Sequence, residues 1–290
     1  MSPGRSIQLT RGTFLLSTAI KLKNNVTLSG SGSSSVIRRD LRAKPFANLI
    51  QIHGTDREPI EGVTVRNLLL DAGFPYSGVK GAGIPGGTLD IALARNITVE
   101  DVTSLYGKSY AFEICRSQNV YIIRTYADYA GNDLYSVTDN AHPLGRTGAS
   151  ESVNIYFIDA VAGPNVAESG FEVDDGPSFV WYIRTQADSI MSLHAHPGQK
   201  VPHHITYSQV IARKGIGVFA ADDGLEKTHH VVIEDSYIGG AKGTRLQVRY
   251  ADNVTVRGGQ IINTSATHPN AGIELSSYNS SNILIDGVII

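Results

Sequence analysis

The sequence predicts an all-β protein, a right-handed parallel β-helix built as a solenoid of about ten coils. A short strand-like phrase recurs along the whole chain, and from the third phrase onward a second alternating strand precedes each one. The composition agrees, because the 290 residues include 30 glycines and no convincing run with the apolar spacing of an amphipathic helix.

The recurring phrase begins with a polar residue, often Asn, and continues with β-branched residues, as in NNVTLSG, RNITVED and DNVTVRG. Its first apolar residue recurs at intervals of 23 to 37 residues, at Val26, Val63, Ile97, Val120, Ile155, Val180, Ile205, Val231, Val254 and Ile283. A base period of 23 to 26 residues with occasional insertions is typical of a solenoid. Crossovers between parallel strands are nearly always right-handed, which sets the expected hand.

The second strand of each coil alternates inward and outward residues, so equivalent positions on successive coils should stack. The inward pairs are apolar or aromatic: Leu89/Ile91, Phe112/Ile114, Tyr135/Val137, Phe171/Val173, Met191/Leu193, Val218/Ala220, Leu246/Val248 and Ile273/Leu275. The first outward column is Asp90, Glu113, Ser136, Glu172, Ser192, Phe219, Gln247 and Glu274. The second is Ala92, Cys115, Thr138, Asp174, His194, Ala221, Arg249 and Ser276. The residues that follow each strand add Arg116, Asp139, Asp175, Ala195, Asp222, Tyr250 and Ser277. We call these three columns the outward ladder.

The stretch SGFEVDDGPS places three carboxylates on one coil of the outward ladder, at Glu172, Asp174 and Asp175. The stacking predicts Asp139 one coil before Asp175, and His194 one coil after Asp174. A like-charge cluster costs free energy unless it binds a cation, meets a basic group or holds a proton for chemistry. Loops rich in turn residues, 73–87 and 140–150, are expected to rim this face and form a cleft for a linear polymer.

The overall charge and the single cysteine exclude several other classes. A net charge of −2 and a pI near 6.5 argue against nucleic acid or a membrane surface as the main partner. Cys115 is the only cysteine, so an internal disulfide is excluded. The first residues lack the layout of a signal peptide, and no apolar run is long enough to cross a bilayer.

Residues 12–37, GTFLLSTAIKLKNNVTLSGSGSSSVI, resemble the opening coils of the pectate-lyase-like superfamily, and the repeats extend this resemblance over nearly the whole chain. Its members include polysaccharide lyases, the polygalacturonase group of glycoside hydrolases, alginate C5-epimerases and phage tailspikes. The resemblance implies a polysaccharide substrate and an extracellular or virion-associated location. We see no N-terminal capping helix, and the chain ends on the apolar strand IDGVII. We therefore expect residues 1–290 to be one β-helix domain, a fragment of a longer chain.

The favoured chemistry is acid–base hydrolysis of glycosidic bonds, which needs a carboxylic acid and a carboxylate. Glu172 and Asp174 are the expected pair, with backbones about 6.6 Å apart along the strand. Asp175, Asp139 and His194 are expected to support them, and no cofactor is required. The remaining candidates should line sugar subsites: Glu113, Arg116, Arg249, His196 and Tyr250. The Gly-His-Gly that the polygalacturonase group carries is absent, because Glu168-Ser169-Gly170 precedes this strand.

Two alternatives remain open. In a Ca²⁺-dependent uronate lyase or C5-epimerase, Glu113, Glu172, Asp174 and Asp175 would hold the ion. Arg116 or Lys200 would then serve as base, and the SGFEVDD coil resembles an alginate-epimerase coil. In a non-catalytic glycan-binding or tailspike β-helix, the acids would form a solvated strand face.

The histidines permit a further alternative. His194 and His196 project from one strand face and could bind a transition metal. The pairs His203-His204 and His229-His230 occupy the position that Asn holds on other coils, so we interpret them as part of a polar ladder at a turn.

Overall fold

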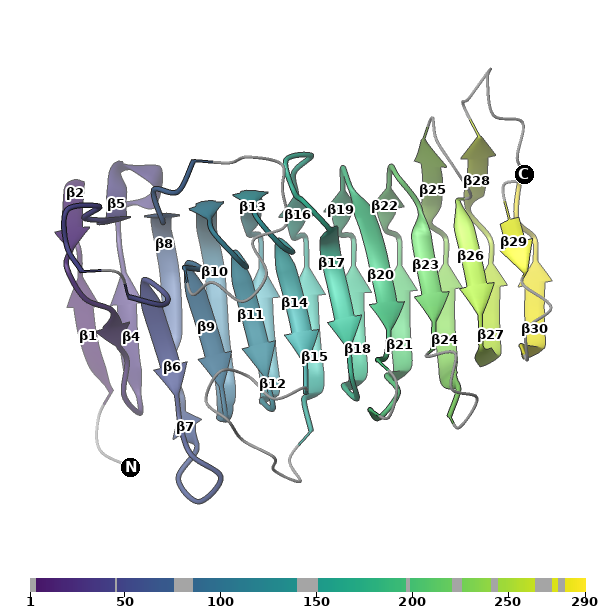
Figure 1. Cartoon of the computed structure of the whole chain (residues 1–290), viewed down its shortest axis with the longest axis horizontal. Coiled ribbons are helices and arrows are strands. Elements are labelled where there is room, and N and C mark those ends of the chain that lie inside the picture. The colour runs from purple at the N-terminus through teal and green to yellow at the C-terminus, as the bar shows by residue number, and fades with distance from the viewer. Residues whose placement is uncertain are drawn as a thin grey trace.

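The computed structural model describes residues 4–44, 46–75, 86–139, 151–196, 199–220, 226–240, 245–263, 273–275 and 280–290. Within these ranges the regular elements are β-strands and one 3₁₀ turn, η1 (Gly32–Ser34), and every strand pairing is parallel. The coils follow one another along the long axis from the N-terminus to the C-terminus (Figure 1). No helix in these ranges is long and apolar enough to span a membrane.

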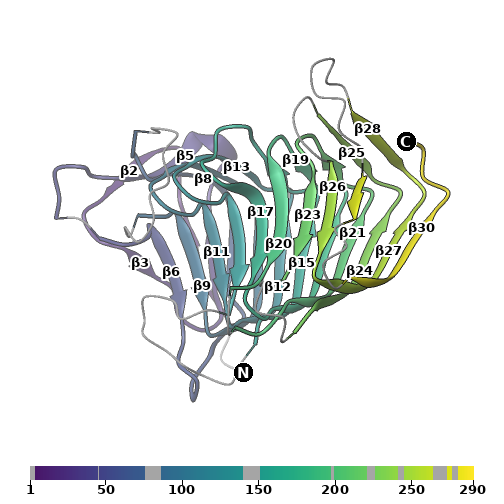
Figure 2. The ribbon, with the colours of Figure 1, turned by 45° about the vertical axis from the view of Figure 1, so that its right-hand side comes forward.

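One strand from each coil joins a ten-stranded sheet that carries the outward ladder. We call it the ladder sheet; it faces the viewer in Figure 1 and comes forward again in Figure 2. Its strands, in spatial order, are β3 (Ile20–Lys21), β6 (Ile50–His53), β9 (Leu89–Ala92), β11 (Phe112–Cys115), β14 (Tyr135–Thr138), β17 (Ser169–Asp174), β20 (Ile190–His194), β23 (Ile216–Phe219), β26 (Leu246–Arg249) and β29 (Ile273–Leu275).

The other strands form a twenty-stranded sheet that wraps the remaining faces of the solenoid. The row behind the ladder sheet is β1 (Arg5–Gln8), β4 (Val26–Ser29), β7 (Ile60–Glu61), β8 (Thr64–Asp71), β10 (Ala94–Gly107), β12 (Gln118–Ile123), β15 (Val153–Ile158), β18 (Ser178–Ile183), β21 (His203–Ser208), β24 (Thr228–Glu234), β27 (Ala251–Arg257) and β30 (Ser281–Asp286). The short strands are β2 (Gly12–Leu16), β5 (Ser35–Arg39), β13 (Tyr126–Ala130), β16 (Val161–Ala162), β19 (Gln186–Ala187), β22 (Ile211–Ala212), β25 (Tyr237–Gly240) and β28 (Gln260–Asn263).

The residue that opens each phrase, usually Asn, forms a sharp corner in the left-handed backbone region. The positive φ values lie between 53° and 61° at Asn25, Asn96, Asn119, Asn154, Phe179, His204, His230, Asn253 and Asn282. We call this column the asparagine corner. Asn tolerates this conformation better than most residues, because its short side chain can hydrogen-bond locally. The amides also bond from coil to coil, Asn119 to Asn96 and Asn154 to Asn119, each at 3.1 Å.

The interior is filled by similar side chains stacked coil on coil. Phe112, Tyr135 and Phe171 stack with centroid distances of 5.0 and 4.6 Å. Phe157, Tyr182 and Tyr207 form a second stack at 5.0 and 4.9 Å. The Phe and Tyr rings of both stacks are fully buried, which confirms the inward positions predicted for the ladder sheet on these coils.

The predicted register is wrong on one coil. Ile216 and Val218 are the inward pair of β23, aligned with Met191 and Leu193, so Val218 and Ala220 are not. Gly217 therefore enters the first outward column and Phe219 moves to the second, beside Arg249. A slip of two residues keeps every side chain on its own face, so the alternation could not detect it. Of the other predicted ladder positions, Ala221, Asp222, Ser276 and Ser277 lie outside the described residues, as do 76–85 and all of 140–150 from the two loops.

Candidate active site

The centre of the outward ladder brings two acids against one histidine. The side chains of Glu172 and Asp174 project from the outward face of β17, because the alternate residues Phe171 and Val173 fill the interior. Asp174 pairs in register with His194 on β20, as predicted. His194 Nδ1 lies 3.6 Å from Glu172 Oε1, and His194 Nε2 lies 3.5 Å from Asp174 Oδ1. The imidazole therefore lies within reach of both carboxyls.

Glu172 is enclosed among other acids. Its pKa is raised well above the usual value, first by burial and then by the charge of Asp133 and a hydrogen bond with it. Asp174 and Glu168 add further negative charge. Two carboxyls can share a hydrogen bond only if one holds a proton. Burial and the neighbouring acids therefore favour the neutral, protonated form of Glu172, which has 8% of its surface exposed.

Asp133 and Tyr110 belong to this site, and sequence reasoning did not select them as site residues. Asp133 is fully buried, and its Oδ1 accepts the backbone N–H of Ser169 at 2.8 Å. The pKa of Tyr110 is raised by burial and then by Glu113, Asp133 and Glu172, while its hydroxyl bonds to Asn132. Both residues precede their ladder strands by two positions. The available signal was the Asn132-Asp133 pair ahead of β14.

Asp175 is the most enclosed of the three acids on this coil. It adopts a positive φ of 56°, and its side chain is fully buried. Its Oδ1 accepts the backbone N–H of His196 at 2.7 Å, and its Oδ2 lies 2.9 Å from His196 Nδ1. The same Nδ1 is 3.2 Å from Asp174 Oδ1. Asp175 thus holds His196 beside Asp174.

The site brings together one possible set of metal ligands, whereas the acids expected to bind Ca²⁺ lie farther apart. Ligand atoms of Asp174, His194 and His196 lie within 4.8 Å of one another, a donor set that suits Zn²⁺ or a similar ion. The four acids expected to hold Ca²⁺ are more scattered. Glu113 and Glu172 flank Ser136, so they stand two coils, about 9.6 Å, apart.

Asp139 and Arg116 form a separate buried pair. Asp139 Oδ1 accepts the backbone N–H of Ser152 at 2.8 Å, and Arg116 Nε donates to the Asp139 carbonyl at 3.3 Å. Burial, with a further contribution from Glu151, raises the pKa of Asp139 to about 6. Arg116 is only 7% exposed, which is less than expected of a residue lining an open subsite.

The other predicted subsite residues lie along the ladder on either side. Arg249 is three coils from Asp174, as predicted, since β20, β23 and β26 follow β17 in order. Tyr250 packs on Ala195, Val201 and Ala220. Glu113 aligns with Asp90 on the preceding coil. Lys200, considered above as a base, forms an exposed ion pair with Glu151.

No known protein family model matches the chain. The pre-neck appendage protein of Bacillus phage B103 is 22% identical over 217 residues, which are 70% of this chain and 24% of that protein. The A-module of mannuronan C-5 epimerase AlgE4 from Azotobacter vinelandii has a similar structure, with a TM-score of 0.77 at 18% identity over 98% of this chain and 79% of that one. Bacteriophage phi29 gene product 12 gives a TM-score of 0.78 at 16% identity, over 97% of this chain and 41% of that one.

These likenesses establish the fold and nothing finer, because the identities are low. The chain is a right-handed parallel β-helix, which confirms the fold class predicted from the sequence.

Proposed function

We propose that this chain is a polysaccharide-processing enzyme that cleaves glycosidic bonds by acid–base catalysis at the centre of the outward ladder. The observation that carries the proposal is that one histidine contacts two carboxyls held in different environments. Burial and the charge of Asp133 raise the pKa of Glu172, while Asp174 lies on the same strand face. Two carboxyl groups held in different environments are the arrangement that glycoside hydrolysis needs.

In the proposed reaction Glu172 donates its proton to the glycosidic oxygen as the bond to the anomeric carbon breaks. Asp174, as a carboxylate, either removes a proton from the attacking water or attacks the anomeric carbon itself. His194 contacts both carboxyls and can return a proton to Glu172 after each turnover. His196, held by Asp175, would contact the sugar beside Asp174. Asp139 supports the neighbouring coil from within, through its bond to Ser152.

A second candidate is elimination or C5-epimerisation on a uronate polymer. It is favoured by the raised pKa of Glu172, whose protonated form could hydrogen-bond a substrate carboxylate, and by His194 as a neighbouring cation once protonated. The structural similarity to the A-module of a mannuronan C-5 epimerase extends over 98% of the chain and agrees with this candidate. Ca²⁺ dependence belongs to this alternative. A non-catalytic glycan-binding β-helix is the third candidate, to which the likeness to a phage appendage protein lends weight.

A time course on neutral and uronate polysaccharides separates these candidates. New reducing ends without the ultraviolet absorbance of an unsaturated uronyl end support hydrolysis, and both signals together support elimination. Deuterium uptake at C5, without either signal, supports epimerisation. Glu172→Gln should abolish the signal, whereas Glu234→Gln, an exposed ion-pair change on β24, should retain it. If no signal appears but the polymer still binds, the enzymatic proposal is wrong and the binding module stands.

A further inference from the structure

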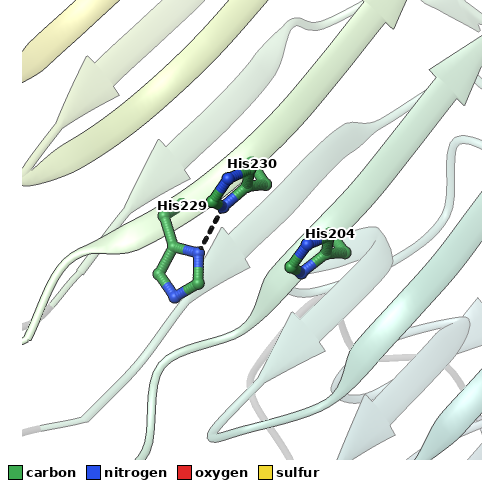
Figure 3. Close-up of side chains that lie close together, drawn as sticks. All are labelled: His204, His229 and His230. Carbon is green, nitrogen blue, oxygen red and sulfur yellow. Dashed lines mark hydrogen bonds between the residues drawn. The ribbon is translucent and has the colours of Figure 1, made fainter.

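On two adjacent coils, histidine replaces asparagine at the asparagine corner. His204 and His230 occupy it with the same φ of 55° that Asn96 and Asn119 adopt. Each is preceded by another histidine, His203 on β21 and His229 on β24. The two strands pair in register, so four imidazoles gather on two neighbouring coils. Figure 3 shows three of them, His204, His229 and His230.

The four rings pack closely. His203 stacks on His229 at 4.9 Å with an interplanar angle of 3°, and His204 stacks on His230 at 4.6 Å and 2°. Within each coil the two Nδ1 atoms are 2.7 Å apart. One nitrogen of each such contact must donate and the other accept, so two imidazolium rings could not share it. The packing therefore requires at least one neutral ring on each coil.

Neutral imidazole is the form that binds metal ions.

We propose that this histidine corner, His203, His204, His229 and His230, is a binding site for a divalent transition metal such as Zn²⁺, Ni²⁺ or Cu²⁺. Ligand nitrogens of His204, His229 and His230 already lie within 4.8 Å of one another. Nitrogens around a tetrahedral ion stand about 3.3 Å apart, with metal–nitrogen bonds of about 2.0–2.1 Å. The side chains would rotate to close that difference when an ion binds. Imidazole selects such ions over Ca²⁺ and Mg²⁺, which prefer oxygen ligands.

The corner is open to solvent, so a fourth ligand position can remain accessible. His230 is exposed, and His204 and His229 are half-buried. A surface groove of about 430 Å³ runs past His204 and His230 to Phe179 and Trp181. Phe179 stacks on His204 at 4.6 Å and closes one side of the ring stack. An ion here would link β21 to β24 and present its free position to this groove.

Calorimetric titration of the purified chain with ZnCl₂, NiCl₂ and CaCl₂ at neutral pH tests the proposal. The informative variant is His204→Asn with His230→Asn, because Asn is the residue that other coils place at this corner. This double variant should keep the circular dichroism spectrum and the metal-free unfolding midpoint of the parent. It should nevertheless lose one equivalent of bound metal, or bind that equivalent at least about tenfold more weakly. If the double variant folds poorly, His229→Gln serves instead. It removes a ligand that does not occupy the positive-φ position, and it should cause the same loss of metal binding.

The second set of ligands, around Asp174, needs its own control. His194→Gln with His196→Gln removes that set and should leave the binding at the histidine corner unchanged. The proposal is overturned if the Asn variant binds Zn²⁺ as the parent does, or if only the His194/His196 variant loses it. It is also overturned if the parent binds no transition metal more tightly than about 1 mM.

Discussion

Replacing Asp139 by Asn should make the protein's stability less sensitive to pH, with a size that follows from the burial of this carboxyl. Burial raises the pKa of Asp139 in the folded state to about 6, against 3.8 when the chain is unfolded. Its Oδ2 is buried and accepts no hydrogen bond from the residues that the structure describes. The folded protein thus holds this proton more tightly than the unfolded chain.

The sign follows from proton linkage. A group whose folded pKa is raised stabilises the fold fully below its unfolded pKa, and this contribution is lost as the pH rises through the folded value. The difference of roughly two pKa units corresponds to about 3 kcal/mol, at about 1.36 kcal/mol per unit. The amide introduced by Asp139→Asn does not titrate, and its oxygen could still accept the Ser152 N–H. Relative to the parent, this variant should gain up to about 3 kcal/mol between about pH 3.5 and about pH 7.5.

Denaturant unfolding at several pH values, with reversibility checked, measures this difference. Asp159→Asn is the matched control, because Asp159 lies on the surface in an ion pair with Arg184 at 2.8 Å that lowers its pKa. An exposed pair of this kind contributes less than about 1 kcal/mol. The free energy of unfolding of the control should therefore fall slightly below that of the parent as the pH rises and the parent's pair forms. A free-energy difference between Asp139→Asn and the parent that stays constant across this range would refute the argument from burial.

Three further predictions concern catalysis, the core and the corners. Glu172→Gln should lower kcat by about 10²–10⁴-fold and remove the fall of kcat/KM at high pH that reports loss of its proton, both read from a pH–rate profile. Phe157→Ala should cost about 3–5 kcal/mol in denaturant unfolding, because the fully buried ring stacks on Tyr182; a loss under about 1 kcal/mol would contradict the packing. Asn119→Ala should destabilise by about 1–2 kcal/mol, and Asn119→Gly by less, since φ is 55° there; equal losses would exclude backbone strain as the cause.

The sequence was sufficient for the solenoid because each repeat is specified twice. The alternation of inward and outward residues defines the two faces of each strand. The residue that opens each recurring phrase must tolerate a positive φ, which is why Asn recurs there. Both signals carry the same period. The alternation alone cannot detect a shift of two residues, as happened at Ile216 and Val218.

The candidate site could be predicted only in part, for a geometric reason. Strand positions transfer from coil to coil, so Glu172, Asp174 and His194 were placed correctly by counting. Residues beyond the strand ends follow turn geometry instead. Asp175 has a positive φ and its carboxyl contacts His196, and Asp133 reaches Glu172 from the turn that precedes β14. Neither direction can be read from a period.

Two features that raise the free energy of the folded state fall on neighbouring coils. Around β17 the chain gathers acids that raise the pKa of Glu172, although Ser136 on β14 shows that a neutral residue fits the same column. From β18 to β24 the asparagine corner carries Phe179, His204 and His230. A bulky residue such as Phe in this backbone region costs free energy that Asn or Gly would avoid. Strain and buried like charges persist mainly where function requires them. Their occurrence in this part of the solenoid therefore supports both proposed sites, one on the ladder sheet and one at the corner that leads out of it.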